Sequence, residues 1–270
     1  MCPVENLMKP DHLLKSLREI LPPEAILSER EDLNPYESDG LTAFRQLPLL
    51  ALLPETEAQV RDILRLCHAE AVPVVARGAG TGLSGGALPL QNGVLLSLAK
   101  FSRILEIDPL ARTARVQPGV RNLAISEAAA VHGLYYAPDP SSQIVCSIGG
   151  NVAENSGGVH CLKYGLTVNN ILALRVLTIE GELLELGSAA LDSAGYDLLA
   201  LMAGSEGLLG VITEVTVKLL PKPERAQVLL AGFDAVEKAG AAVADIISAG
   251  IIPAGLEMMD RLAIEAAEDF

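Results

Sequence analysis

The chain has 270 residues, half of them apolar, enough to bury one large hydrophobic core or two smaller ones. Its net charge of −14 argues against nucleic acid and anionic membrane surfaces as partners, and no apolar run reaches the roughly 18 residues of a membrane span. The four cysteines form no C-x-x-C pair and the N-terminus shows no signal-peptide pattern, so a reduced, cytoplasmic protein is expected.

The first segment of the chain is predicted to form a helix followed by an arm. Leucines share one stripe at helical spacing over residues 11–21, and Pro22 and Pro23 end that helix. Residues 28–47 are polar and turn-forming, and we expect them to wrap over the domain that follows.

A β-α-β unit is predicted over residues 49–76. Residues 49–53 and 72–76 are apolar strands, and Thr56 with Gln59 has the spacing of a helix capping box between them. The buried stripe of that helix is predicted to consist of Val60, Ile63, Leu64 and Cys67.

A glycine-rich loop follows the second strand directly. Five of the ten residues over 77–86 are glycine, which lets the backbone take positive φ and lets N–H groups crowd together. Such concave arrays of N–H donors bind phosphate, and Arg77 can add a fixed cation. The alternative is an ordinary flexible loop, although such loops rarely carry five glycines immediately after a buried strand.

Two common phosphate-binding frames do not suit this loop. Gly80, Gly82 and Gly85 match G-x-G-x-x-G literally, but a dinucleotide fold needs a helix next, and a turn-rich segment follows instead. A Walker loop needs Gly-Lys-Ser/Thr, and no lysine lies between Arg77 and Lys100. Phosphate binding is therefore expected outside both frames.

The next segment is predicted to contain three strands and a helix. Residues 94–98 form one strand, and 104–108 with 113–117 form a hairpin. A helix follows over 123–131, and Asn122 is its expected N-cap.

A second glycine-rich stretch covers residues 138–158. Two Gly-Gly pairs and many hydroxyl and amide side chains suit irregular backbone laid flat against a large ligand, and a purely structural loop is the alternative. Cys146, His160 and Cys161 match no zinc spacing, so a metal site is not expected.

The rest of the chain is predicted to contain a hairpin, a helix and a long strand, followed by a separate unit. Residues 171–179 and 182–186 are predicted to form a hairpin, 197–202 a helix and 211–220 an alternating strand that two prolines end. Beyond residue 224 we expect a separate β-α-β unit.

The last part of the chain is too short for a sheet of its own. Strands are predicted over 227–231 and 251–259, around an Ala-rich helix that Asp234 caps, and a further helix begins at 260. We therefore expect the chain to be cut inside a second domain.

Five separated motifs occur in order along the chain: Arg-Gly-Ala-Gly-Thr-Gly-Leu-Ser-Gly-Gly at 77–86, Pro-Asp-Pro-Ser-Ser at 138–142, Ser-Ile-Gly-Gly-Asn-Val-Ala-Glu-Asn at 147–155, Lys-Tyr-Gly at 163–165, and Gly-Ser-Glu-Gly at 204–207 with Gly-Val-Ile-Thr at 210–213. Together they resemble the FAD-binding domain of the vanillyl-alcohol oxidase and p-cresol methylhydroxylase type. Together with Gly-Leu-Glu-Met-Met-Asp at 255–260, the residues of these motifs are most similar to those of the flavoprotein subunits of bacterial glycolate oxidases. D-lactate dehydrogenases of the same family are near neighbours.

The resemblance implies an α+β fold in which FAD extends between two subdomains. Residues 1–46 would be the N-terminal helix and arm, and 47–223 the FAD-binding domain. Residues 224–270 would be the truncated start of an α/β substrate (cap) domain, the C-terminal domain of FAD-linked oxidases.

The resemblance also assigns cofactor-binding residues in three groups. The loop takes the pyrophosphate through Arg77, Gly78, Ala79, Gly80, Thr81, Gly82, Leu83, Ser84 and Gly85. The adenosine and flavin sides are lined by Pro138, Asp139, Ser141, Ser142, Cys146, Ser147, Gly149, Gly150, Asn151, Ala153, Glu154, Gly157 and Gly158. Tyr164 and Gly165 are further cofactor-binding residues. The cleft is closed by Glu206, Gly210, Val211 and Ile212.

The implied chemistry is FAD-dependent oxidation of a small 2-hydroxy acid, glycolate to glyoxylate first and D-lactate as the alternative. Implied partners are a second FAD-binding subunit and an iron–sulfur subunit, with no nucleic acid and no membrane span, and peripheral attachment to the inner membrane is an alternative to a purely cytoplasmic location. Two other classes stay open: an FAD enzyme with a nicotinamide donor, and a non-catalytic FAD-binding subunit module.

Two departures from the family matter. Some members tether FAD through a histidine in the first glycine loop, where this chain has Ala79 and Thr81, so non-covalent FAD is expected. None of the four histidines lies in a motif equivalent to the family's catalytic one. We therefore expect no catalytic residue and no metal site in this chain, and place the catalytic residues downstream of Phe270.

Overall fold

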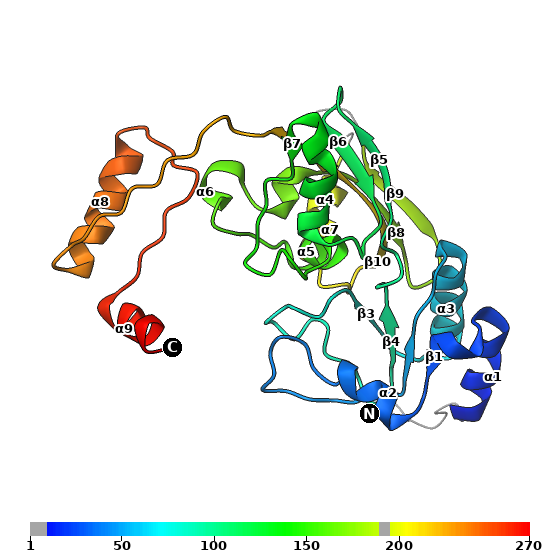
Figure 1. The fold of residues 1–270 in the computed structure, drawn as a ribbon. Coiled ribbons are helices and arrows are strands. Elements are labelled where there is room, and N and C mark those ends of the chain that lie inside the picture. Colours follow the sequence, from blue (N-terminus) through cyan, green and yellow to red (C-terminus); the bar gives the residue numbers. More distant parts are fainter. Residues whose placement is uncertain (1–9, 189–194) are drawn as a thin grey trace.

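The structure, a computed structural model, describes residues 10–188 and 195–270 (Figure 1). Two sheets organise the body: a four-stranded sheet of order β1-β2-β4-β3 and a five-stranded sheet of order β5-β6-β10-β8-β9. Each sheet has its own hydrophobic core, so the body consists of two subdomains. The fold class is α+β, as predicted.

The first subdomain contains the predicted β-α-β unit, but with a third strand inserted. Its elements are β1 Ile26–Leu27, β2 Leu50–Leu52, α3 Glu57–Ala69, β3 Val74–Arg77 and β4 Val94–Ser97. β4 lies between β2 and β3 and is parallel to both. The glycine-rich connection between β3 and β4 contains no helix, which confirms that a dinucleotide-binding frame does not apply.

Helix α3 packs on one face of this sheet together with α1, Pro10–Ile20 (Figure 1). Its predicted capping box is present: the Gln59 amide donates to Thr56 Oγ1 at 3.2 Å, and the Thr56 amide donates to Gln59 Oε1 at 3.1 Å. The four residues predicted for its buried stripe are all buried. Burial raises the pKa of the Cys67 thiol to about 12, so this cysteine is a packing residue.

The opposite face of the sheet is covered by the arm, as predicted. The arm contains α2 Arg30–Leu33 and the short turns η1 Pro23–Ala25 and η2 Asn34–Tyr36. Leu33 is buried against Ala51 of β2 and Leu95 of β4, and Tyr36 and Leu47 pack beside them. The sheet is therefore sandwiched between helices and the arm.

The second subdomain is an antiparallel sheet with helices on one face. Its strands are β5 Ile104–Asp108, β6 Thr113–Val116, β8 Ile171–Leu177, β9 Leu183–Gly187 and β10 Val211–Lys218. Its helices are α4 Asn122–Ala129, α5 Ile148–Glu154, α6 Cys161–Tyr164 and α7 Leu198–Met202, with short turns η3 Ala130–His132 and η4 Thr167–Asn170. β7 Leu134–Tyr135 pairs with β11 Leu220–Pro221. The two predicted hairpins and the alternating strand are confirmed.

Two expectations in this subdomain were wrong. Asn122 does not cap α4, because Arg121 occupies the N-cap position and Asn122 is the first helical residue. Part of the second glycine-rich stretch is helix α5 instead of irregular backbone. Glycine disfavours helices, but a Cβ on Gly149 would lie 2.5 Å from Pro118 Cβ, so close packing explains why glycine is used there.

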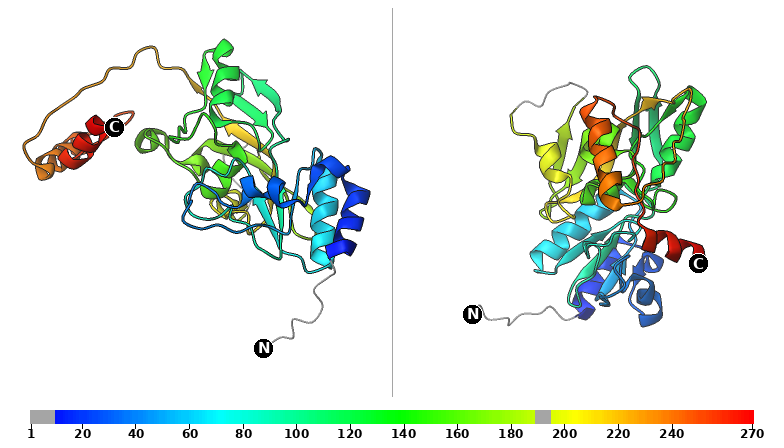
Figure 2. Two further views of the ribbon diagram at one scale, coloured as in Figure 1. Left: turned by 60° about the horizontal axis from the view of Figure 1, so that its bottom comes forward. Right: turned by 90° about the vertical axis from the view of Figure 1, so that its left-hand side faces the viewer.

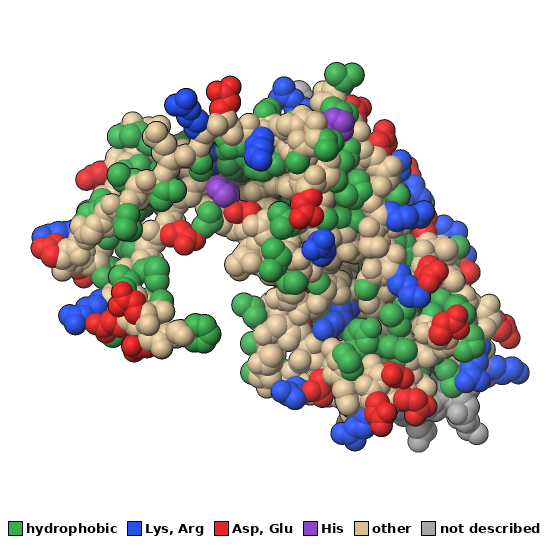
Figure 3. Space-filling model, in the orientation of Figure 1, with side chains coloured by type: hydrophobic (Ala, Val, Ile, Leu, Met, Phe, Trp, Pro, Cys, Tyr) green, Lys and Arg blue, Asp and Glu red, His purple; other side chains and the backbone are tan. Residues whose placement is uncertain are grey.

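The C-terminal residues leave the body as an extended segment with two helices, α8 Val236–Ser248 and α9 Arg261–Asp269 (Figures 1 and 2). The strands predicted over 227–231 and 251–259 do not form, because neither segment has a neighbouring strand to bond with. Asp234 pairs with Lys238 at 2.7 Å instead of capping α8, whereas Asp260 caps α9. Hydrophobic side chains remain exposed along this segment (Figure 3).

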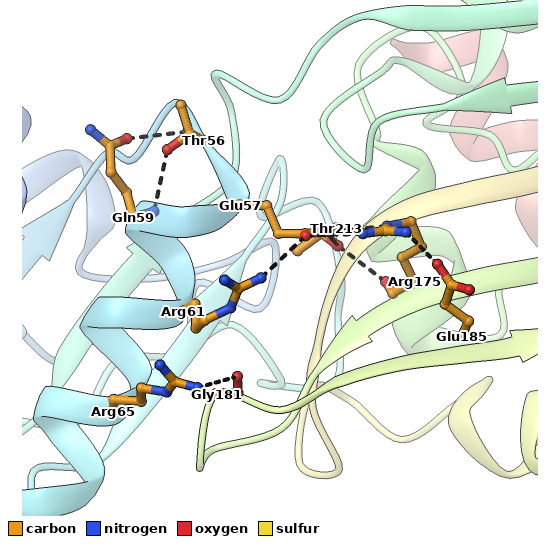
Figure 4. Close-up of polar contacts among 9 residues, drawn as sticks. All are labelled: Thr56, Glu57, Gln59, Arg61, Arg65, Arg175, Gly181, Glu185 and Thr213. Atoms are coloured by element: carbon orange, nitrogen blue, oxygen red, sulfur yellow. Dashed lines mark hydrogen bonds and ion pairs between the residues drawn. The ribbon is translucent and has the colours of Figure 1, made fainter.

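A polar network joins the two subdomains at the start of α3 (Figure 4). The Glu57 carboxylate accepts hydrogen bonds from Arg175 Nη2 of β8 at 3.1 Å and from Thr213 Oγ1 of β10 at 2.8 Å. Arg61 lies 3.7 Å from the same carboxylate, and Arg175 also pairs with Glu185. The network fixes α3 against the five-stranded sheet.

This network makes stability depend on pH. Partial burial opposes ionisation of Glu57, but the hydrogen bonds and charges of Arg175, Thr213 and Arg61 outweigh it and hold the pKa of the carboxyl below its usual range. A carboxyl whose pKa is lower in the folded than in the unfolded state stabilises the fold above its unfolded value, and this contribution is lost as the pH falls through the folded pKa.

We therefore expect Glu57→Gln to lower the free energy of unfolding by about 1 kcal/mol near neutral pH, and the difference from wild type to vanish in acid. Urea unfolding across that pH range measures both values. Glu185→Gln is the control, because Glu185 is 69% exposed and should contribute little. A pH-independent difference would contradict the ionised role of Glu57.

Candidate functional site

A cleft of about 380 Å³ lies where loops of the two subdomains meet. Small residues dominate its walls, so backbone atoms supply much of its surface. Its lining residues are Ala76, Arg77, Gly78, Ala79, Gly80, Thr81, Gly82, Leu83, Gly86, Ala87, Leu98, Pro118, Pro140, Ser141, Ser142, Cys146, Ser147, Gly149, Gly150, Asn151, Ala153, Glu154, Ser156, Gly157, Glu206, Gly207, Gly210 and Ile212.

The first glycine-rich loop presents a row of unpaired donors in this cleft. Across the described part of the chain, no group accepts a hydrogen bond from the backbone amides of the lining residues 80–83. Gly80 and Gly85 have φ of +70° and +82°, in the left-handed region that favours glycine. Clustered, unpaired N–H groups of this kind bind anions.

Helix α5 and its N-cap Ser147 form the facing wall. The Ala79 amide donates to Ser147 Oγ at 3.3 Å, and a Cβ on Gly78 would lie only 2.2 Å from that oxygen. Glycine at position 78 is therefore required for the loop to approach the helix so closely.

The side-chain amides of Asn122 and Asn151 are buried behind the facing wall and connect α5, α4 and the segment at Pro138. Asn151 Nδ2 of α5 donates to Asn122 Oδ1 at 2.8 Å, and Asn122 Nδ2 donates to the Pro138 carbonyl at 2.9 Å. Both side chains are buried, where each polar group needs a partner. Asn122 thus positions the wall instead of capping α4.

The ionisable groups of the cleft are unevenly distributed. Arg77 is the one Lys, Arg or His side chain among the described lining residues. Glu154 accepts a hydrogen bond from Ser84 Oγ at 2.7 Å, and Glu206 has a φ of +54°, which is uncommon for a residue with a side chain. A polyanion would therefore find its counter-charge in Arg77 and in backbone dipoles.

The cleft brings together twenty of the residues expected to bind cofactor. They are Arg77, Gly78, Ala79, Gly80, Thr81, Gly82, Leu83, Ser141, Ser142, Cys146, Ser147, Gly149, Gly150, Asn151, Ala153, Glu154, Gly157, Glu206, Gly210 and Ile212. The other eight, Ser84, Gly85, Pro138, Asp139, Gly158, Tyr164, Gly165 and Val211, do not line it.

Several residues outside the lining form a separate cluster beside it. Asp139 Oδ2 lies 2.6 Å from His160 Nδ1, and the His160 and Tyr164 rings are 6.2 Å apart. Gly165 has a φ of +78°, so it serves the turn after α6. Val211 packs in the core of the first subdomain.

Eight lining residues were not predicted: Ala76, Gly86, Ala87, Leu98, Pro118, Pro140, Ser156 and Gly207. Gly86, Pro140 and Gly207 lie inside the motifs themselves, so the signal was available. Leu98 and Pro118 reach the cleft only because the chain folds back, and no local pattern marks them.

Within 10–188 and 195–270, no group of three or more His, Cys, Asp and Glu side chains is arranged to hold a metal ion. None of the helices in these ranges combines the length and apolarity needed to cross a membrane.

Residues 48–187 match the FAD binding domain family, and residues 222–270 match the family of FAD linked oxidases, C-terminal domain. The chain therefore belongs to the FAD-binding domain family of FAD-linked oxidases. Among its relatives is glycolate oxidase subunit GlcD of Escherichia coli (strain K12), 69% identical over 258 residues that cover 96% of this chain and 52% of the relative. GlcD of Bacillus subtilis (strain 168) is 43% identical over 87% of this chain and 50% of the relative.

The chain spans about half the length of these curated relatives. Solved structures share the fold at lower identity. Alkyldihydroxyacetonephosphate synthase matches with a TM-score of 0.79 and 22% identity, covering 94% of this chain and 48% of that one. A Phl p 4 variant described as a glucose oxidase matches with a TM-score of 0.66 and 20% identity, over 78% and 44% of the two chains.

The residues of the cleft fit the cofactor that this family implies. The unpaired amides of residues 80–83 suit a pyrophosphate, and Arg77 offers it a positive charge. A Cβ on Gly82 would have no protein atom closer than 3.5 Å, so this glycine leaves open space on its side of the loop.

Proposed function

We propose that this chain is the FAD-binding part of an enzyme that oxidises a small 2-hydroxy acid, with glycolate, converted to glyoxylate, as the first candidate substrate. The observation that carries the proposal is the 69% identity to a glycolate oxidase subunit over 258 residues. The cleft supports it, because it offers a largely backbone-lined surface with an anion-binding loop at one wall.

Each wall has its own role in this proposal. The loop 77–86 holds the pyrophosphate, the wall of residues 138–158 lies along the adenosine and flavin, and residues 206–212 close the cleft. When bound, FAD supplies the acceptor for the α-hydrogen and its two electrons. The protein contributes orientation, exclusion of water and a set of fixed N–H dipoles.

The domain boundaries follow the same reasoning. Residues 47–223 form the FAD-binding domain, and residues 224–270 begin the C-terminal oxidase domain. The exposed hydrophobic side chains of the C-terminal segment support this, since Val228, Leu229 and Leu230 are each at least 90% exposed and need a covering partner.

D-lactate is the second candidate substrate. D-lactate dehydrogenases of Archaeoglobus fulgidus and Anaerostipes hadrus are 38% and 33% identical to this chain, over 80% and 98% of its length. Assaying the protein from its complete gene on both acids with an artificial electron acceptor distinguishes them. The proposal expects a higher kcat/KM for glycolate, and no turnover of either acid would contradict it.

Partner subunits belong to the proposal as well, because the GlcD relatives of Escherichia coli and Bacillus subtilis are both named as glycolate oxidase subunits. A second FAD-binding subunit and an iron–sulfur subunit are the candidates that the resemblance suggests.

We expect the FAD to be bound without a covalent bond. The loop carries no histidine, and no histidine lines the cleft in the ranges that the structure describes. Acid precipitation of the complete, yellow protein should release all flavin into the supernatant. Flavin that stays with the pellet would contradict the expectation and would direct attention to Cys146, the buried thiol in the wall.

A further inference from the structure

The arm touches the back of the glycine-rich loop. Gly40 lies against the loop so closely that a Cβ there would be 2.7 Å from the Gly82 carbonyl oxygen and 2.8 Å from that of Thr81. The arm and the loop therefore make direct backbone contact, although about forty residues separate them in the sequence.

Arg77 makes a second connection between the arm and the loop. Its guanidinium lies over the ring of Tyr36 at 5.7 Å, which suits a cation–π contact. Its Nη1 donates to the Ala87 carbonyl at 3.3 Å, and its Nη2 would be 2.3 Å from a Cβ on Gly80. Arg77 thus spans the interior of the loop, from its start to its end, and is 8% exposed.

Asp39 is a buried carboxylate, and its described hydrogen bonds include none from a positively charged group. The residue is 6% exposed, and its Oδ1 accepts a hydrogen bond from the Leu41 amide at 2.8 Å. Its Oδ2 is buried and has no hydrogen-bond partner within the described ranges. A buried carboxylate is costly unless an opposite charge compensates it.

Arg77 is the buried cation near this carboxylate, because it lies over Tyr36, three residues before Asp39, and spans the loop that Gly40 contacts. Burial lowers the pKa of its guanidinium, and the negative charge of Asp39 opposes that shift. Only one of its five N–H donors has a hydrogen-bond partner in the described part of the chain, so it retains donors for a second anion.

We propose that Asp39 and Arg77 form a charge couple that holds the glycine-rich loop in its phosphate-accepting shape, so that the arm sets the affinity for FAD. Asp39 acts as a positioning residue: it compensates and orients Arg77, and Gly40 beside it supports the loop from behind. A loop with five glycines loses much conformational entropy when it is ordered, and a loop that is already held loses less on binding. This inference rests on the proposed binding of FAD in this cleft.

The test is a double-mutant cycle in the protein from its complete gene, with the Kd for FAD measured by quenching of flavin fluorescence. Asp39→Asn should weaken FAD binding at least about tenfold, since it removes the compensating charge and keeps the shape. In the Arg77→Gln background the same substitution should change the Kd less than about threefold, because the couple is already broken. Asp32→Asn on α2, which is exposed, is the matched control and should leave the Kd unchanged.

Each outcome is decisive. An unchanged or tighter Kd for Asp39→Asn overturns the charge couple, and so does an equal effect of Asp39→Asn in both backgrounds, which would indicate a merely structural role. If Asp39→Asn does not fold, Gly40→Ala keeps the inference testable: it should weaken FAD binding by displacing the loop, and an unchanged Kd contradicts support from the arm. Failure of the wild-type protein to bind FAD would overturn the proposed function instead.

Discussion

Replacing Gly82 with valine is expected to abolish FAD binding while the protein still folds. The position has no left-handed φ, and the nearest protein atom to an added Cβ, Glu154 Oε1, is 3.5 Å away. The valine would therefore fit the protein and occupy the space that we assign to the pyrophosphate. We expect the affinity to fall at least 100-fold, about 2.8 kcal/mol, from steric overlap.

The measurement is the flavin content of the purified variant, with its thermal unfolding as a test of folding. Gly150→Val on the facing wall should behave similarly, because its closest contact would be Ser147 Oγ at 3.3 Å. Gly232→Val is the matched control, since nothing lies within 4 Å of its Cβ position. Full flavin content in folded Gly82→Val would mean that the loop does not face the cofactor.

Residues 1–270 alone are expected not to oxidise glycolate or D-lactate. Removing the α-hydrogen requires a base within hydrogen-bond reach of the hydroxyl and a cation that pairs with the carboxylate. Arg77 is buried between the arm and the loop, and His160 is paired with Asp139 outside the lining. Without a placed base, turnover should be lower than that of the complete protein by at least 10²- to 10⁴-fold, on the order of a general base's contribution.

The fragment would be mixed with FAD, and the reduction of a dye by each acid would be followed. Retained flavin in the same sample shows that the cleft is formed, so that missing turnover reports missing catalytic groups. Turnover close to that of the complete protein would contradict the prediction and would place a base before Phe270.

Local sequence patterns predicted most helices and strands, but not which strands pair with one another in the sheets. The capping box of Thr56 and the alternation along β10 act within a few residues, so the sequence alone defines them. The insertion of β4 between β2 and β3 depends on packing between distant segments. Strands were predicted wrongly over 227–231 and 251–259, because β-propensity forms no strand without a partner to bond with.

Lining residues of the cleft could be predicted where glycine allows the backbone to come close to another group, as at Gly78 and Gly80. The residues behind the cleft were not, because their roles depend on contacts across the fold. Asn122 has the residue type of a helix cap, yet its side chain bonds to Asn151 and Pro138. Asp39 lies in a polar, turn-forming arm, and its burial comes with the close approach of that arm to the glycine-rich loop, which Gly40 contacts.

The most direct test is to mix the complete, flavin-loaded protein with glycolate in the absence of oxygen and to follow its visible flavin absorbance. The proposed function predicts bleaching by glycolate as the flavin is reduced, with slower bleaching by D-lactate. Flavin that stays oxidised with both acids would contradict the assignment of this chain to a 2-hydroxy-acid oxidising enzyme.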